Sequence, residues 1–304
     1  MECLESVRQQ DYPNLELIVN DDASKDESAS VIGAWLAKSP IPHRFLRNQI
    51  NLGLCRSLNN ALSHARGKYI SGIAADDVWL PGKLHSQVRR MEQLPDSVGV
   101  LYTDALQMDE QGRGLEGSFI PVYRRFDKMP EGNIYQTLWK GNFIPAMTTL
   151  IRRQCYEVVG LYDERLYYED WDMWLRIAHR FEFAYGSEFS ARYRIVSTSM
   201  MNKHLDRIID AICQVCLKHL TTFQLDPEAS TAARSLLYEY AIASYERKTT
   251  KYRHNLLKAL RFKPTPGLAL RCIFDFCGMD SHQFGRVRGL VRPVKPAAES
   301  IAAR

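Results

Sequence analysis

Three pairs of neighbouring acidic residues are the positions in this sequence best suited to chemistry. A carboxylate is costly to bury unless a cation or several hydrogen-bond donors accompany it, so a buried pair points to a ligand. Mg²⁺ and Mn²⁺ take oxygen ligands and are often held by one or two carboxylates together with substrate phosphates. A carboxylate can also accept a proton as a general base. The pairs are Asp21 with Asp22, Asp76 with Asp77, and Glu169 with Asp170.

The first two pairs follow short apolar runs that are typical of buried strands. One run occupies residues 15–19 and the other residues 69–73. From the residue types alone, we expect Asp76 or Asp77 to anchor a metal ion on a diphosphate, and the first pair to accept hydrogen bonds from a base or a ribose. Helix capping or turn formation is the open alternative for both pairs, since Asp favours these roles.

Strands and helices alternate along the chain as far as about Tyr102. Apolar residues at helical spacing follow each predicted strand, for example between Leu54 and Ala65. This order predicts an α/β fold, with a mostly parallel sheet flanked by helices. In such sheets ligands bind beyond the carboxyl ends of the strands, which is where the first two acidic pairs fall.

The third acidic pair stands at the start of a predicted helix. Trp171, Trp174 and Ala178 form its apolar face, so Glu169 and Asp170 lie at its N-terminal end. Acidic residues also favour this position through the helix dipole, and that alternative stays open. Beyond residue 200 the pattern is helical throughout, so we expect a first domain over residues 1–200 and a helical C-terminal region over residues 201–304.

Composition excludes several classes of protein. The 304 residues are 45% hydrophobic and 25% charged, which is typical of a globular chain and not of a disordered, collagen-like or coiled-coil one. No apolar run approaches the roughly 18 residues of a membrane span. No apolar signal segment opens the sequence, so we expect a cytoplasmic protein in which the seven cysteines are reduced.

The charge of the chain is unevenly distributed. Residues 247–304 carry 13 Lys and Arg against 3 Asp and Glu, whereas the rest of the chain has a net charge of −5. A basic tail suits an anionic surface, and here that suggests peripheral contact with the inner face of a membrane. We expect no nucleic-acid partner, because no recognisable binding motif accompanies the charge. A solvated helical face is the alternative for this tail.

Three blocks of the sequence resemble the family 2 glycosyltransferases. The first is ECLESVRQQDYPNLELIVNDDASKD, from Glu2 to Asp26, and the second is NLGLCRSLNNALSHARGKYISGIAADDVWLPGKL, from Asn51 to Leu84. The third contains GLYDERLYYEDWDMWLRIA and carries the family's "ED" motif. The resemblance implies a GT-A fold, which is a Rossmann-like sheet with a donor half and an acceptor half. It also implies transfer of a sugar from a nucleoside-diphosphate sugar to a saccharide or lipid-linked acceptor hydroxyl, with inversion, in polysaccharide or glycolipid synthesis.

The resemblance also implies roles for residues around the donor. In the register of the family's "D-x-D" motif, Ala74 replaces the first aspartate and Asp76 keeps the second, so Asp76 is the expected Mg²⁺ or Mn²⁺ ligand. Asp77 is a further candidate beside it. Asp21 and Asp22 match the loop that binds the nucleoside. Two residues of the following helix, Arg56 and Asn59, support the nucleotide pocket.

On the acceptor side, Asp170 matches the family's general base. Glu169 is expected to position the acceptor or Asp170, and Arg194 matches a stretch that contacts the diphosphate. The family also begins with a strand and a loop ahead of the helix that opens this sequence. We expect that this strand is missing from the chain as written.

Other functions are weaker fits to the sequence. The main alternative is a non-catalytic, truncated relative that binds a nucleotide or a partner. A Rossmann dehydrogenase is disfavoured because no G-x-G-x-x-G motif follows a strand. Cys213, Cys216 and His219 invite a zinc interpretation, but no second pair follows at the spacing of a structural zinc site.

Overall fold

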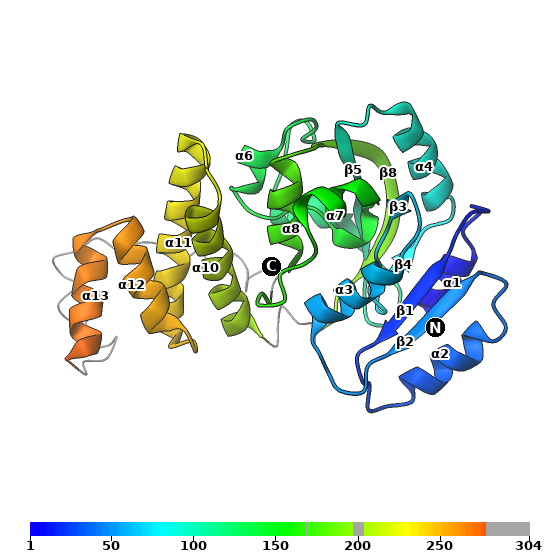
Figure 1. Cartoon of the computed structure of the whole chain (residues 1–304), viewed down its shortest axis with the longest axis horizontal. Coiled ribbons are helices and arrows are strands. Elements are labelled where there is room, and N and C mark those ends of the chain that lie inside the picture. The colour runs from blue at the N-terminus through cyan, green and yellow to red at the C-terminus, as the bar shows by residue number, and fades with distance from the viewer. Residues whose placement is uncertain (168, 197–203, 278–304) are drawn as a thin grey trace. The chain divides into compact units, whose positions relative to one another are not determined.

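The computed structural model describes residues 1–167, 169–196 and 204–277, which divide into two compact units (Figure 1). The first unit comprises Met1–Arg165 and Glu169–Val196, and the second Leu166–Tyr168 and Ser197–Arg304. The domain boundary that we expected at residue 200 lies outside the described residues.

The first unit is built on two sheets. Parallel strands β1 (Leu17–Asp21) and β2 (His43–Arg47) form a small one. The larger has the order β3-β7-β5-β8-β4, with β6 added to β5. Its strands are β3 (Tyr69–Ile70), β4 (Val78–Trp79), β5 (Val98–Met108), β6 (Gly114–Ser118), β7 (Leu150–Arg152) and β8 (Glu182–Arg194). Figure 1 shows β5 and β8 running together through the unit.

The prediction of an α/β fold is confirmed, but the larger sheet is mixed and not mostly parallel. Of its pairings among the described residues, only β5 with β8 is parallel, and β3–β7, β4–β8, β5–β7 and β5–β6 are antiparallel. The physical reason is that β3 and β4 do not pair with their sequence neighbours. β3 pairs with β7 and β4 with β8, two strands that come after the alternating part of the chain, and β4 and β7 run opposite to β3, β5 and β8.

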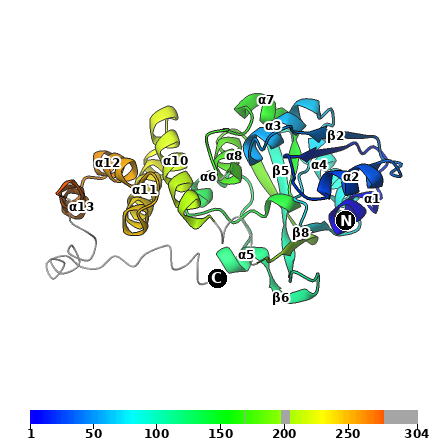
Figure 2. The ribbon, with the colours of Figure 1, turned by 90° about the horizontal axis from the view of Figure 1, so that it is seen from below.

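Helices cover the sheets of the first unit. The long strand β5 is buried along nearly its whole length, as an apolar run between two partners should be. Figure 2 shows β6 and α5 gathered at the far end of β5, away from α3 and α7. The helices are α1 (Glu2–Arg8), α2 (Ser28–Leu36), α3 (Leu54–His64), α4 (Lys83–Gln93), α5 (Phe119–Tyr123), α6 (Tyr135–Leu138), η1 (Ala146–Thr148), α7 (Arg153–Val159) and α8 (Glu169–Ala178).

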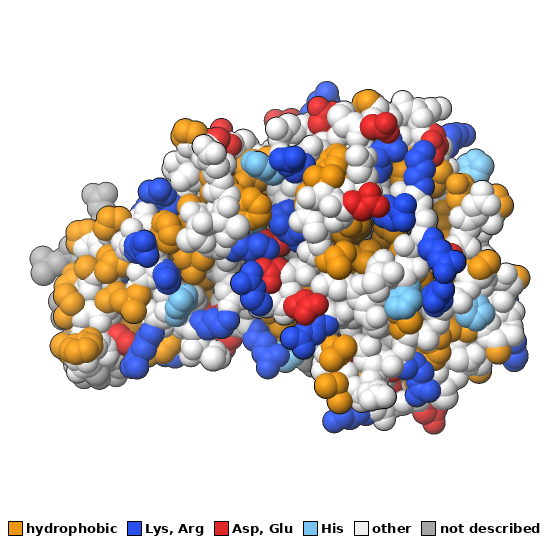
Figure 3. Space-filling view, in the orientation of Figure 1, with side chains coloured by type: hydrophobic (Ala, Val, Ile, Leu, Met, Phe, Trp, Pro, Cys, Tyr) orange, Lys and Arg blue, Asp and Glu red, His pale blue; other side chains and the backbone are white. Residues whose placement is uncertain are grey.

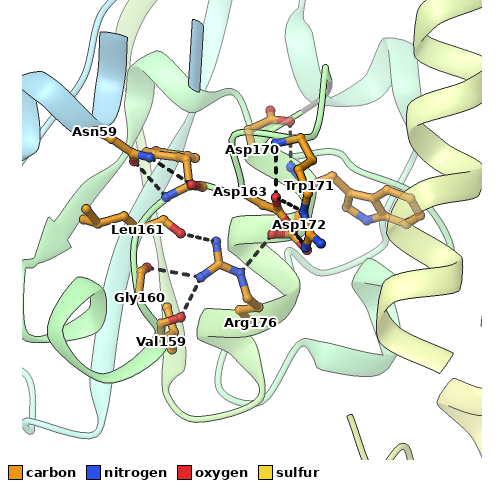
Figure 4. Close-up of polar contacts among 11 residues, drawn as sticks. Asn59, Val159, Gly160, Leu161, Asp163, Asp170, Trp171, Asp172 and Arg176 are labelled. Atoms are coloured by element: carbon orange, nitrogen blue, oxygen red, sulfur yellow. Dashed lines mark hydrogen bonds and ion pairs between the residues drawn. The ribbon is translucent and has the colours of Figure 1, made fainter. Parts of the chain in front are cut away.

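A buried ion pair ties α8 to the chain that precedes it. Arg176 and Asp172 lie one helical turn apart, with Nε 2.9 Å from the carboxylate and side chains only 6% and 0% exposed. The same guanidinium donates to the carbonyls of Val159 at 2.6 Å, Gly160 at 3.1 Å and Leu161 at 2.9 Å (Figure 4). A buried charge needs this many partners, because each unsatisfied group carries a desolvation cost.

The second unit is helical among its described residues, which confirms the predicted C-terminal helical extension. Asp210 is buried within it, whereas residues 278–304 of the predicted basic tail lie outside the described residues. No described helix of the chain has the length and apolar character needed to cross a membrane. The helices are α10 (Leu205–Thr222), α11 (Pro227–Arg247), α12 (Tyr252–Phe262) and α13 (Pro266–Phe276).

Replacing Arg176 by Met should destabilise the first unit by about 3–5 kcal/mol, because Asp172 would be left buried without its cation. All five tryptophans lie in this unit, so urea unfolding followed by tryptophan fluorescence reports on it alone. Arg165→Gln is the matched control, since Arg165 pairs with Asp163 at the surface and should matter far less. Equal losses in the two variants would contradict the assignment.

Candidate functional site

Asp22 organises the loop between β2 and α3. Its carboxylate accepts hydrogen bonds from the Asn48 side chain at 2.8 Å and from the backbone amides of Leu52 at 2.7 Å and Gly53 at 2.9 Å. Partial burial alone would raise the pKa of Asp22, but these hydrogen bonds outweigh it and hold the pKa below its ordinary value. Asp21 is buried and accepts from the Ser24 amide at 3.3 Å. Both residues shape the loop that we predicted to bind the nucleoside.

Arg56 and Asn59 connect α3 to the segment that leads into α8. The Asn59 side chain donates to the Tyr162 carbonyl at 2.9 Å and accepts from the Tyr162 amide at 2.9 Å. Arg56 Nε lies 3.1 Å from the carboxylate of Glu164. Figure 4 shows Asn59 facing this segment beside the Arg176 cluster. In the structure both predicted pocket residues therefore hold protein segments together.

Asp76 and Asp77 point in different directions. Asp77 is buried and accepts a hydrogen bond from the Arg194 amide at 3.0 Å, whereas Asp76 is exposed. Burial raises the pKa of Asp77 to about 7, and the Asp76 carboxylate adds to the rise. Asp76 is thus the carboxylate of this pair that is accessible to a ligand.

The donor set around Asp76 fits a metal that is held mainly by its substrate. Among the described residues, no three His, Cys, Asp or Glu side chains gather where they could hold an ion. Hard divalent ions are commonly bound by one or two carboxylates plus substrate phosphates, and an exposed Asp76 suits that mode. On α10, Cys213 and Cys216 are buried, free thiols.

Arg194 fixes the backbone of the Asp76 loop. Its guanidinium donates to the carbonyl of Asp76 at 2.8 Å, to that of Glu110 at 3.2 Å and to that of Asp109 at 3.3 Å, and it also pairs with the Glu2 carboxylate. Three segments distant in sequence therefore meet on one cation. The predicted contact of Arg194 with a diphosphate stays a prediction.

Lys83 holds the segment that runs from β3 toward Asp76. It is almost fully buried at the start of α4, and its ammonium donates to Ser71 at 2.8 Å and to Gln87 at 2.7 Å. Burial lowers the pKa of Lys83 to about 7. Ser71 in turn donates to the Thr149 carbonyl at 2.6 Å, so the residue that follows β3 is fixed both to α4 and to the segment before β7.

Glu169 and Asp170 begin α8, as predicted. Asp170 accepts a hydrogen bond from the Asn142 side chain at 3.0 Å and another from the Trp171 amide at 2.6 Å. Burial raises the pKa of both carboxyls, and for Glu169 the neighbouring Asp170 carboxylate raises it further. A carboxyl that gains its proton above the ordinary range can exchange protons close to neutral pH, as a general base must.

Aromatic side chains connect the two acidic regions. Phe119 packs on Tyr123 with ring centroids 4.5 Å apart and on Tyr193 at 5.0 Å. Burial raises the pKa of Tyr193, and Tyr123, Asp77 and Asp76 add to the rise. Burial also raises the pKa of Tyr123, with a further contribution from the Asp170 carboxylate. Among these three rings, which we call the aromatic wall, Tyr193 is thus within electrostatic reach of Asp76 and Tyr123 within reach of Asp170.

The start of α3 belongs to the same region. Burial raises the pKa of Cys55 to about 12, and the Glu169 carboxylate contributes next. Cys55 follows the loop that Asp22 holds at Gly53. These contacts link the loop held by Asp22, the start of α3 and the start of α8. The gathering of all the predicted residues around one site stays a prediction. Our sequence reasoning missed Phe119, Tyr123 and Asn142, whose only signal was a run of aromatic residues between 119 and 126.

Fold and site define this chain as a GT-A glycosyltransferase. It belongs to glycosyl transferase family 2, whose sequence model matches residues 1–159. The glycosyltransferase AmsE of amylovoran biosynthesis, from Erwinia amylovora, is 28% identical over 178 residues, which cover 58% of this chain and 62% of that protein. The chain spans between 60% and 68% of the length of four further curated relatives.

Two solved structures share the fold. S. aureus TarS in complex with UDP matches with a TM-score of 0.65 and 15% identity, over 97% of this chain and 90% of that one. The mannosyltransferase PcManGT from Pyrobaculum calidifontis, in complex with GDP-Man and Mn²⁺, matches with a TM-score of 0.57 and 16% identity, over 93% of this chain and 77% of that one. The prediction of a GT-A fold is confirmed.

Glu169→Gln should stabilise the first unit at high pH. Because the pKa of Glu169 is raised on folding, the folded chain keeps a proton that the unfolded chain has lost, so stability falls as the pH rises above the ordinary range of a carboxyl. The neutral amide removes this loss and should add about 1–2 kcal/mol at pH 8.5 and nothing at pH 4.

The measurement is urea unfolding followed by tryptophan fluorescence at the two pH values. Glu157→Gln is the matched control, because Glu157 is exposed on α7 and pairs with Arg153 only at 3.5 Å. A gain of the same size at pH 4 and pH 8.5 would show that ionisation of Glu169 is not its cause.

Proposed function

We propose that this chain transfers a sugar from a nucleoside-diphosphate sugar to an acceptor hydroxyl with inversion at the anomeric carbon. The observation that carries the proposal is the position of Asp170. It is a partly buried carboxylate at the start of α8 with a raised pKa and a hydrogen bond from Asn142, and its charge also raises the pKa of Tyr123, a ring of the aromatic wall. An inverting transfer needs a base on one side of the sugar and a bound diphosphate on the other.

The donor is expected to lie along the loops that Asp22 and Arg194 hold. Asp21 and Asp22 would face the nucleoside, and Arg56 and Asn59 would support this pocket through the contacts of α3. UDP in TarS and GDP-Man in PcManGT support a nucleoside-diphosphate donor for this chain too. Which nucleoside binds here is a question for a donor screen.

Asp76 is the residue that would hold a Mg²⁺ or Mn²⁺ ion, with Asp77 behind it. When bound, such an ion neutralises charge on the departing diphosphate as a Lewis acid. Asp77 is turned toward the Arg194 amide, so it would keep the loop in place and not bind the ion directly. The Mn²⁺ bound in PcManGT supports a divalent cation.

The protein side of the reaction centres on Asp170. One carboxylate oxygen accepts from the Asn142 side chain and the other from the Trp171 amide. As the acceptor oxygen forms its bond to the anomeric carbon, Asp170 takes the hydroxyl proton, and the electron pair of the breaking carbon–oxygen bond leaves with the diphosphate. Burial and the Asp170 carboxylate raise the pKa of Glu169, so in its protonated form it would donate a hydrogen bond toward the acceptor or toward Asp170.

The acceptor is proposed to be a saccharide or a lipid-linked saccharide in polysaccharide or glycolipid synthesis. AmsE, which is named for amylovoran biosynthesis, supports this class of pathway. The rings of the aromatic wall suit the apolar face of a sugar. The alternative of a non-catalytic binding relative is not favoured, since the matched family is one of transferases.

Asp170→Asn should reduce sugar transfer roughly 10²- to 10⁴-fold, because the amide cannot accept the proton. Donor binding should change by less than about twofold, since Asp170 acts on the acceptor. In the wild type, kcat/KM should rise with pH over a range above that of an ordinary aspartate, because the pKa of Asp170 is raised.

The test combines a donor screen for product formation with calorimetric titration of UDP and GDP. Asp127→Asn provides the matched control, because Asp127 is an exposed carboxylate outside the site. If Asp170→Asn abolished donor binding as well as transfer, Asp170 would not be the base.

Asp76→Asn should weaken Mn²⁺-dependent binding of the donor nucleotide by at least about tenfold, while binding without metal should stay unchanged. Titrations of UDP and GDP with Mn²⁺ and with EDTA measure the two terms separately. Asp11→Asn, at an exposed carboxylate before β1, is the matched control. Equal losses with and without Mn²⁺ would argue against a metal ligand at Asp76.

A further inference from the structure

A basic hollow opens in the second unit where α12 begins. It has a volume of about 730 Å³ and is open to solvent. Three of the residues around it carry basic side chains, and the other three offer a hydroxyl or an amide. Its lining residues are Gln214, Thr250, Lys251, Tyr252, Arg253 and His254.

A buried carboxylate fixes the rim of this hollow. Asp210 on α10 accepts hydrogen bonds from the Thr249 hydroxyl at 2.5 Å, the Asn255 amide group at 2.8 Å and the Lys251 backbone amide at 3.1 Å. The turn before α12 and the first turn of α12 are therefore held in place. The backbone amide of Lys251 donates to Asp210, whereas the side chain of Lys251 is exposed.

The side chains that line the hollow include two cations, Lys251 and Arg253, and no carboxylate. Asp275 on α13 is shared by Arg253 at 2.8 Å and Lys248 at 3.1 Å, so one carboxylate serves two cations. Within the described part of the chain, no carboxylate forms an ion pair with Lys251, Lys258 or Arg261. The start of a helix adds partial positive charge of its own. An anion is the ligand that this field favours.

Exposed apolar side chains adjoin the basic ones. Leu257, one turn after Arg253 on α12, is 61% exposed. On α13, Ile273 is 56% and Phe276 93% exposed, and Phe276 follows directly on Asp275, which binds Arg253. Figure 3 shows hydrophobic side chains over α13 and basic ones over α12. Large apolar side chains this exposed next to cations are characteristic of surfaces that contact lipid.

We propose that α12 and α13 dock on the surface of an anionic phospholipid bilayer. A lipid phosphate occupies the hollow beside Lys251 and His254, and Leu257, Ile273 and Phe276 enter the headgroup region. The charge favours an anionic surface over a neutral one, and the apolar residues favour a bilayer over a soluble anion. The inference depends on the second unit alone, so it stands or falls separately from the proposed transferase activity.

The test is flotation of the full chain with vesicles of phosphatidylcholine alone or with 30% phosphatidylglycerol. The wild type should float with the anionic vesicles only, and 0.5 M NaCl should release it. Lys251→Gln with Lys258→Gln removes two cations and should lower the partition coefficient roughly 30-fold. Leu257→Ser with Phe276→Ser should lower it at least about tenfold.

Matched controls place the same changes on the first unit. Lys38→Gln with Lys128→Gln removes two exposed cations there, and Leu115→Ser with Val158→Ser removes two exposed apolar side chains. All four double variants should keep the wild-type circular dichroism, because the positions are at the surface. Both controls should float like the wild type.

Three outcomes would overturn the proposal. One is equal flotation with neutral and anionic vesicles, and another is wild-type flotation of both α12–α13 variants. The third is complete release from anionic vesicles by 1 mM inorganic phosphate at constant ionic strength, which would identify the hollow as a site for a free anion. Persistence of vesicle binding in phosphate, together with loss in both variants, would establish the lipid surface.

Discussion

One buried guanidinium holds α8 and the chain before it in place. Arg176 pairs with Asp172 inside α8 and donates to three successive carbonyls, from Val159 to Leu161. The next residue, Tyr162, is fastened to Asn59 through two hydrogen bonds, so the constraint passes on to α3. From α3 it reaches the loop held by Asp22. The orientation of α8, and with it that of Asp170, therefore depends on a charge that is almost fully buried.

Burial shifts the pKa values of several charged groups in the site. Burial raises the pKa of Asp77, Glu169 and Asp170, and it lowers the pKa of Lys83. Their hydrogen-bond partners are uncharged groups, which offset the cost of burial less than an opposite charge would. Such an arrangement costs stability, but it leaves groups whose charge state responds to pH near neutrality. Asp22 shows the opposite solution, since backbone amides keep its carboxylate ionised.

Much of the fold and part of the site could be predicted from the sequence. The apolar pattern predicted a strand at residues 15–19, close to β1, and the position of the acidic pair at the start of α8 followed from the spacing of that helix's apolar residues. Strand direction was wrong because a buried strand looks alike in both directions, and β7 and β8 carry no sign of their partners. The contacts of Asp22 and Asn59 reach across about 30 and 100 residues. The aromatic wall escaped notice because Tyr193 and Phe119 meet only in three dimensions.

The way Arg194 holds its loop bears on how such sites diverge. It grips the carbonyl oxygen of Asp76 and leaves the side chain of that residue untouched. Backbone oxygens are the same in every amino acid, so mutations here can alter the chemistry of the loop while its path is preserved. Ala74, at the first position of the expected D-x-D register, still accepts a hydrogen bond from the Asp77 amide at 3.2 Å, so the turn closes without a carboxylate there. Because Arg194 holds the backbone, substitutions of side chains in this loop can change its affinity for a cation without changing the path of the chain.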